Sequence, residues 1–266
     1  MGAKKVMAFH SYKGGTGKTT CVVNLAALYA SMGKKVCLID FDVYAPSLTS
    51  YFGVSPKYFI HDLLSGDAGI HEVLIDYSRK LGLSGELHIA FSSPAKEDIH
   101  GIEIRYDDNF QLKALRQFLS VKRRLIEREG FDYIFIDTSP GIRYWSINAL
   151  ATADLLFLML KVNDMDINGT KRMISEIYDA LTRYGLSTHL ILNKVPGASP
   201  IEYDMNLFKE IQEEITETLN LPVFLSIPCF CDIQFNRKEF LWAIKKPEHP
   251  FSKKIREIPS LLTEIA

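Results

Sequence analysis

The chain has 266 residues, of which 47% are hydrophobic and 24% charged, a composition typical of a globular protein with one large core. Its formal net charge of −1 provides no overall attraction to nucleic acid or anionic lipid. No apolar stretch approaches the roughly 20 residues that span a bilayer, and no secretory signal pattern is present. The spacing of the cysteines favours neither a disulfide framework nor a zinc site. We therefore expect a soluble, cytoplasmic protein.

Short apolar runs alternate with longer amphipathic stretches from end to end. The apolar runs predict strands at residues 6–9, 36–40, 88–91, 133–137, 155–160, 189–192 and 223–227. The amphipathic stretches predict helices at residues 17–32, 112–128, about 170–183 and 205–219, and residues 251–266 predict a helix interrupted by Pro259. Several strands are apolar at every position, as in a parallel sheet covered on both faces. We therefore predict one α/β domain over residues 1–266, with a doubly wound, mostly parallel sheet flanked by helices.

A phosphate-binding loop is predicted between the first strand and the first helix, where the sequence reads Lys13-Gly14-Gly15-Thr16-Gly17-Lys18-Thr19-Thr20. Backbone N–H groups of such a loop, and the positive end of the following helix, bind a nucleotide's phosphates. Lys18 is expected to reach the β- and γ-phosphates, and the Thr19 hydroxyl to coordinate Mg²⁺. Tyr12 stands where the ordinary motif has its first glycine. This implies a negative φ there and a specific packing site for the ring.

A second lysine, Lys13, precedes the glycines, so the motif reads KGGTGKTT. It resembles the deviant Walker A motif, KGGxGK[ST], of the group that contains MinD, ParA, the arsenite pump and the nitrogenase iron protein. The resemblance runs from about Val6 to Pro228 and more weakly to about Phe251. It implies a P-loop NTPase that binds ATP and Mg²⁺ and forms an ATP-dependent homodimer. In that family the extra lysine reaches the partner subunit's phosphates, so the resemblance assigns Lys13 a catalytic role beside Lys18.

Carboxylates end two of the predicted strands, at the sheet edge where ligands bind in such folds. Asp40 and Asp42 follow the strand at residues 36–40. The resemblance implies that Asp42 is catalytic and positions the attacking water, and that Asp40 lies near the Mg²⁺ and phosphates. Asp137 ends an apolar strand in the Walker B form. It is expected to hold Mg²⁺ through a coordinated water, and residues 138–141 are expected to form a switch that senses the γ-phosphate.

Two further strand ends are expected to bind the base. In related proteins an asparagine at the position of Asn193 hydrogen-bonds the adenine edge, and Pro228 resembles the family's proline loop beside the base. A GTPase would require an aspartate at position 196, where this chain has Pro196. The sequence therefore favours ATP, and the guanine alternative stays open.

The resemblance implies an ATP-dependent dimerisation switch of the MinD/ParA type, which serves spatial positioning, partitioning or division-site regulation. Its intrinsic hydrolysis is expected to be slow and to be stimulated by a protein partner. Membrane docking is doubtful, because the tail ends without aromatic or basic residues and contains Pro259. DNA binding through a basic patch receives little support from the near-zero net charge; the candidate patch comprises Arg237, Lys238, Lys245 and Lys246.

Other functions remain open on the same fold. The main alternative is a metabolic ATP-dependent enzyme, a synthetase or kinase, whose second substrate would bind under residues 93–110. Lys13 argues against it, because a self-contained kinase needs no cation from a partner. An iron–sulfur relative is disfavoured, since no cysteine lies near residues 137–141. A pump or targeting ATPase is also disfavoured, because the insertions are short and polar.

Overall fold

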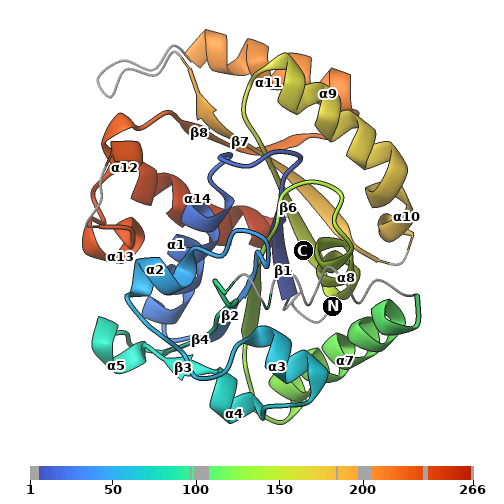
Figure 1. Ribbon diagram of the computed structural model, residues 1–266. Coiled ribbons are helices and arrows are strands. Elements are labelled where there is room, and N and C mark those ends of the chain that lie inside the picture. Colours follow the sequence, from blue (N-terminus) through green and yellow to red (C-terminus); the bar gives the residue numbers. More distant parts are fainter. Residues whose placement is uncertain are drawn as a thin grey trace.

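A mostly parallel sheet forms the centre of the molecule. The computed structural model describes residues 6–95, 98, 108–183, 185–196, 205–235 and 239–264. Within them, eight strands pair in the order β3-β4-β2-β5-β1-β6-β7-β8 (Figure 1). The strands are β1 Val6–His10, β2 Lys35–Phe41, β3 Ile75–Asp76, β4 Glu86–Ala90, β5 Tyr133–Thr138, β6 Leu155–Leu160, β7 Ser187–Val195 and β8 Val223–Pro228. Only β3 runs antiparallel to its neighbour among these strands.

Helices cover both faces of this sheet (Figure 1). One face carries α1 Lys18–Ser31, α2 Leu48–Phe52, α5 Ser78–Leu81, α12 Cys231–Phe235, α13 Trp242–Lys245 and α14 Pro250–Glu264. The other carries α3 Ile60–Ser65, α4 Ile70–Val73, α7 Asp108–Glu127, α8 Tyr144–Thr152, α9 Asp164–Met173, a π-helical turn Ile174–Tyr178, α10 Asp179–Thr182 and α11 Met205–Leu219. This is the predicted doubly wound α/β architecture, and the fold prediction is confirmed.

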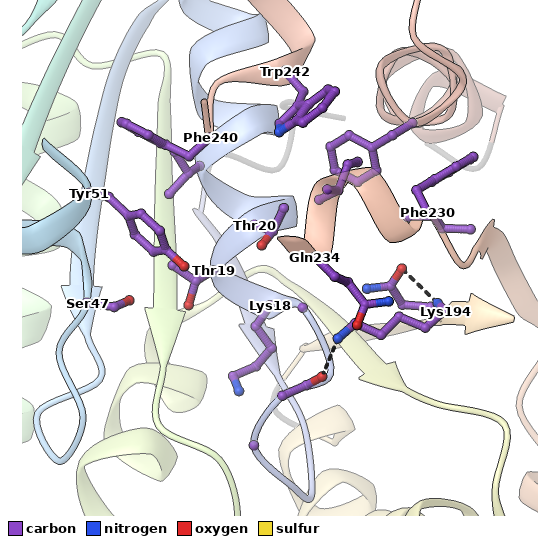
Figure 2. A pocket seen from close by; sticks show the side chains of 18 of the residues that line it. Lys18, Thr19, Thr20, Ser47, Tyr51, Lys194, Phe230, Gln234, Phe240 and Trp242 are labelled. Carbon is purple, nitrogen blue, oxygen red and sulfur yellow. Dashed lines mark hydrogen bonds between the residues drawn. The ribbon is translucent and has the colours of Figure 1, made fainter. Parts of the chain in front are cut away.

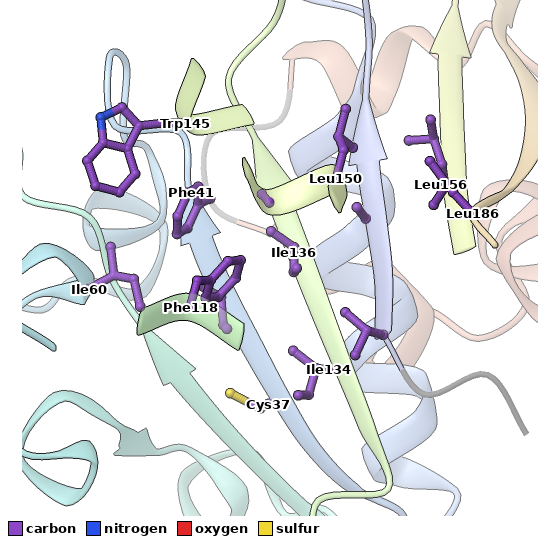
Figure 3. Close-up of a cluster of buried hydrophobic side chains, with 14 of the residues drawn as sticks. Cys37, Phe41, Ile60, Phe118, Ile134, Ile136, Trp145, Leu150, Leu156 and Leu186 are labelled. Carbon is purple, nitrogen blue, oxygen red and sulfur yellow. The ribbon is translucent and has the colours of Figure 1, made fainter. Parts of the chain in front are cut away.

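The two core layers follow from the two-residue period of the strands. In β1, Val6 and Ala8 face the layer under α7 and α8, whereas Met7 and Phe9 face the layer under α1. Figure 3 shows the first layer, where the ring of Phe41 from β2 stacks on Phe118 from α7 at 4.9 Å between centroids. Because both faces are apolar, the predicted strands read as continuous hydrophobic runs.

The seven predicted strands are confirmed, with ends that agree to within three residues, and most corrections concern short elements. The sequence prediction missed β3 and the helices α2, α3, α4, α5, α8, α12 and α13. The helix predicted from residue 170 begins earlier, because Asn163 caps α9 by accepting a hydrogen bond from the Asp166 amide at 3.0 Å. Most of the unassigned segment 93–110 lies outside the described residues, as do Arg237 and Lys238.

The predicted interruption of the C-terminal helix at Pro259 is wrong. Helix α14 runs continuously from Pro250 to Glu264 with Pro259 inside it. Proline removes one backbone hydrogen bond, but the buried side chains of Phe251, Ile255 and Ile258 fix the helix against the layer under α1. Packing therefore outweighs the local preference of proline. Within the described residues, no helix has both the length and the apolar character needed to cross a membrane.

Candidate nucleotide-binding site

The phosphate loop connects the carboxyl end of β1 to the first turn of α1. Gly15 and Gly17 have φ values of +73° and +93°, which side-chain-bearing residues rarely adopt. A Cβ atom on Gly17 would also clash with the Asn193 side-chain amide. Gly17 accepts a hydrogen bond from the Cys21 amide at 3.0 Å, so the loop enters the helix without a break. The amides at the start of α1 are thereby directed at the position of a bound anion.

Lys18 lies inside the loop as predicted. Its ammonium group donates to Ser11 Oγ at 3.0 Å, and Ser11 Oγ in turn donates to the Lys13 carbonyl at 2.6 Å. Burial lowers the pKa of Lys18, whereas the neighbouring carboxylates of Asp137 and Asp42 raise it. Lys18 is only 6% exposed, so its charge has lost most of its hydration. A bound phosphate would compensate for this loss by pairing with the ammonium group.

Thr19, Asp137 and Asp40 meet at the predicted metal position. Thr19 Oγ1 donates to Asp137 Oδ2 at 2.6 Å, and Asp40 lies opposite Asp137 in the register of β2 and β5. The second oxygen of each carboxylate, Asp137 Oδ1 and Asp40 Oδ2, is buried without a hydrogen-bond partner. Burial raises the pKa of Asp137 to about 7 and that of Asp40 well above its ordinary range.

These uncompensated oxygens fit a hard divalent cation, which prefers carboxylate and hydroxyl ligands. The described part of the chain contains no group of three His, Cys, Asp or Glu side chains able to hold a metal alone. In many Mg²⁺ sites one or two carboxylates act together with phosphates and water. The residues present therefore fit Mg²⁺ bound together with a nucleotide.

Asp42 connects the two loops that flank the phosphate position. Its Oδ1 accepts hydrogen bonds from Ser139 Oγ at 2.7 Å and from the Ala45 amide at 3.2 Å. The switch loop, residues 138–141, is also joined to the segment between β1 and the phosphate loop, since the Gly141 amide donates to the Ser11 carbonyl at 2.9 Å. Asp42 lines the pocket beside the phosphate loop and is partly exposed. Sequence reasoning did not identify Ser139 as its partner.

Lys13 and Tyr12 face away from the pocket that Lys18 enters. The Lys13 ammonium lies 3.4 Å from Sδ of Met165, a side chain that is 67% exposed, and Lys13 is absent from the lining of the pocket. The ring of Tyr12 packs directly on Gly169 of α9, where any Cβ atom would overlap the ring. Tyr12 is not among the residues with positive φ. The expected negative φ and specific packing site of Tyr12 are both confirmed.

A pocket of about 470 Å³ extends from the phosphate loop across α1 (Figure 2). Lys194, Gln234 and Phe230 lie on one side of α1, and Tyr51 and Phe240 lie on the other. The lining contains every predicted nucleotide-binding residue except Thr16, namely Gly14, Gly15, Gly17, Lys18, Thr19, Thr20, Asn193 and Pro228. Thr16 is buried beneath the loop and takes part through its carbonyl group.

Asn193 lies beside the expected base position, but its amide is held by the phosphate loop. Its Nδ2 donates to the Thr16 carbonyl at 2.7 Å, and its Oδ1 accepts from the Lys194 amide at 2.9 Å. Lys194, which sequence reasoning did not assign to the site, has a φ of +57° and donates from Nζ to the Gly15 carbonyl at 3.1 Å. The base side of the pocket and the phosphate loop therefore form one connected unit.

The far wall of the pocket includes Phe240 and Trp242, in a segment that is fixed by Asn24, and the sequence analysis did not assign these residues to the site. Asn24, in the middle of α1, is fully buried; its Nδ2 donates to the Phe240 carbonyl, and its Oδ1 accepts from the Ala243 amide, both at 2.8 Å. The Phe240 ring contacts Tyr51 at 5.4 Å between centroids. The sequence signal for this interaction was the amide of Asn24 within the apolar run of α1, because a buried polar group requires hydrogen-bond partners.

The glycine loop, the buried lysine, and the carboxylates at the ends of β2 and β5 define a P-loop NTPase. The model of the AAA domain family (AAA_31) matches residues 4–190, and the chain belongs to this family.

Relatives and solved structures agree with this class. The chromosome-partitioning ATPase Soj of Treponema pallidum is 29% identical over 226 residues, which cover 84% of this chain and 82% of the relative. The cell division ATPase MinD of Pyrococcus furiosus superposes with a TM-score of 0.74 at 22% identity and covers 100% of both chains. MinD of Pyrococcus horikoshii, complexed with Mg-ADP, has a TM-score of 0.71 at 23% identity and covers 98% of this chain and 95% of that one. At these identities the structures bear on the fold alone.

Proposed function

We propose that this protein is an ATP-dependent dimerisation switch of the MinD/ParA type, which hydrolyses ATP slowly with Mg²⁺. The observation that carries the proposal is the position of Lys13 beside Met165, outside the pocket that Lys18 enters. A cation placed there does not serve its own nucleotide, and a second subunit facing this surface would receive it. The relatives named for partitioning and cell division support the same function.

The residues within one subunit have separate tasks in this mechanism. Lys18 and the loop amides bind the phosphates and stabilise the charge that develops during transfer. Thr19 and Asp137 would hold Mg²⁺, with Asp40 behind them, and the ion would neutralise phosphate charge. Asp42, held by Ser139, is placed to orient the attacking water.

Light scattering with ATP and Mg²⁺ tests the proposal. Asp42→Ala blocks turnover, so this variant is expected to accumulate as a dimer with ATP and to be monomeric with ADP. Adding Lys13→Ala is expected to abolish the dimer, whereas adding Lys34→Ala, an exposed lysine at the far end of α1, leaves it intact. A monomer in the Asp42→Ala variant with ATP demonstrably bound would contradict the dimer switch and favour the metabolic alternative.

The location of the protein and the molecules that it binds are also part of the proposed function. We infer a cytoplasmic protein with a protein partner that stimulates hydrolysis. Membrane docking by the tail is disfavoured, because the apolar side chains of α14 are buried against the body of the molecule. For DNA binding, Lys245 and Lys246 are exposed near the end of α13, and a salt-dependent mobility shift with ATP is the measurement that decides it.

A further inference from the structure

A buried histidine lies behind the switch loop, and the mechanism above does not use it. His10 is the last residue of β1, directly before the phosphate loop, and is 2% exposed. Its Nδ1 lies 2.6 Å from Thr138 Oγ1, and the same Thr138 hydroxyl donates to the Phe9 carbonyl at 2.7 Å. The Thr138 hydroxyl therefore links the His10 ring to the backbone of β1, whichever ring nitrogen carries the hydrogen.

The surroundings of His10 keep the ring neutral and fixed. Burial, and to a smaller extent the nearby Lys18 charge, lower the pKa of His10 to about 3, against the opposing effect of a backbone hydrogen bond with Gly141. The ring of Tyr178 meets the imidazole edge-on at 6.1 Å between centroids. Tyr178 ends the π-helical turn, an irregularity that is frequent at functional sites. His10 is therefore a neutral side chain held in place by Thr138 and Tyr178, and its part in the site is a fixed hydrogen bond.

Thr138, the hydrogen-bond partner of His10, lies in the chain between two residues of the site. Thr138 directly follows Asp137, the metal-binding carboxylate, and directly precedes Ser139, whose hydroxyl donates to Asp42. The Ser139 carbonyl in turn accepts from Ser146 Oγ at 2.9 Å at the start of α8. A shift of Thr138 would thus displace the metal carboxylate and the partner of the water-orienting carboxylate together.

We propose that His10 is a positioning residue for ATP hydrolysis, which through the hydrogen bond between its Nδ1 and Thr138 Oγ1 fixes the switch loop relative to the phosphate loop. The inference rests on the proposed ATPase function. His10 touches none of the residues expected to contact the base, and the phosphate loop keeps its own hydrogen bonds without it. Loss of the bond is therefore expected to lower kcat and to leave ATP affinity nearly unchanged.

Three substitutions of His10 distinguish the effect of the hydrogen bond on kcat from the effect of packing. Asparagine places an amide group, which can donate or accept a hydrogen bond, close to the position of Nδ1; glutamine places one near Nε2, and alanine places none. We expect His10→Ala and His10→Gln to lower kcat by about 10- to 100-fold, the scale of a small misplacement at a reacting centre. His10→Asn is expected to recover most of this loss. The Kd for ATP with Mg²⁺ should change by less than about threefold in all three variants.

A double-mutant cycle with Thr138→Val tests the route of the effect. If His10 acts through Thr138, His10→Ala combined with Thr138→Val is no slower than the slower single variant. Multiplication of the two losses would overturn the proposal. So would an Asn variant no faster than the Gln variant, or kcat values that follow only the melting temperatures of the variants.

Hydrogen–deuterium exchange of the peptide covering residues 138–143, measured without nucleotide, keeps the inference separate from the proposed function. Faster exchange in the Ala and Gln variants, but not in the Asn variant, supports the positioning role even for a protein with no ATPase activity. Equal exchange in all variants contradicts it. A wild-type protein that hydrolyses no ATP contradicts the ATPase function alone.

Discussion

Gly17 has a backbone conformation that other residues rarely adopt, and the space around its Cα leaves no room for a side chain. Its φ of +93° disfavours every other residue, and its missing Cβ leaves room for the Asn193 amide. We expect Gly17→Ala to weaken ATP binding by about 10- to 100-fold, from about 1–2 kcal/mol of backbone strain plus displacement of Asn193. Isothermal titration with ATP and Mg²⁺ measures the loss.

Gly33 supplies the matched control for this prediction. It has a φ of +82° but open space around its missing Cβ, and it lies at the opposite end of α1. Gly33→Ala should therefore lower the free energy of unfolding and leave the Kd for ATP unchanged. Equal weakening of ATP binding by both substitutions would show that general strain, and not the contact with Asn193, is responsible.

Asp137 gives the stability of the metal-free protein a defined pH dependence. Its pKa is raised to about 7 in the folded state, against about 3.9 in an unfolded chain. Between about pH 4 and pH 7 the folded state therefore binds more protons, so the free energy of unfolding falls as the pH rises through this window. Above pH 7 the full penalty of the buried carboxylate is present.

Asp137→Asn removes this ionisation. In EDTA and without nucleotide, the variant should be more stable than wild type at pH 8 by roughly 1–3 kcal/mol, and this advantage should disappear near pH 4–5. Urea unfolding at both pH values provides the measurement. A difference between variant and wild type that is the same at both pH values would mean that Asp137 is not the titrating group.

Most site residues were predictable because the chemistry fixes both residue type and spacing. The phosphate loop and the carboxylates at the ends of β2 and β5 belong to this group, since they are local signals in sequence. The bond from Asn193 to the Thr16 carbonyl joins residues 177 positions apart, and no local pattern contains it. His10 carried no signal either, because an isolated histidine in an apolar run is indistinguishable from a core residue.

At the scale of elements, Asn24 attaches α13 and the residues directly before it to α1. Its side chain makes hydrogen bonds with the carbonyl of Phe240 and the amide of Ala243. Asn24→Ala would leave both backbone groups buried without a partner, at a cost of about 2–4 kcal/mol in the free energy of unfolding. We also expect weaker ATP binding, because Phe240 and Trp242 line the pocket.

Ser31 on the same helix is the control for Asn24. Its hydroxyl bonds only to the Leu28 carbonyl within the helix, so Ser31→Ala should change the free energy of unfolding by less than about 0.5 kcal/mol. Chemical denaturation and ATP titration of both variants provide the comparison. A small loss for Asn24→Ala would show that water replaces the side chain.

Elements were predictable in proportion to their length and burial. The strands through the centre of the sheet are apolar on both faces and were all found. Helices of four to six residues, such as α3 and α5, complete no amphipathic period and were missed. The continuous course of α14 depends on contacts with α1 and β8, which outweigh the signal of Pro259.

At the scale of the molecule, the placement of α14 predicts how the protein behaves with lipid. Phe251, Ile255 and Ile258 of α14 are buried in the core, so these apolar side chains are not available to insert into a membrane while the helix stays in place. We expect the protein with ATP to remain in the supernatant when anionic vesicles are sedimented. ATP-dependent sedimentation with vesicles would show that α14 detaches or that another surface binds lipid.

The two-residue strand β3 has a consequence for the behaviour of the protein at high concentration. An open sheet offers unpaired backbone groups at its outer strands, and these can pair with other molecules and start aggregation. On one side of this sheet the outer strand is β3. It pairs with His88 and Ile89 of β4 and carries the exposed carboxylate of Asp76. Such a short, charged margin is a poor template for another strand, and this disfavours edge-to-edge association through the β3 side of the sheet.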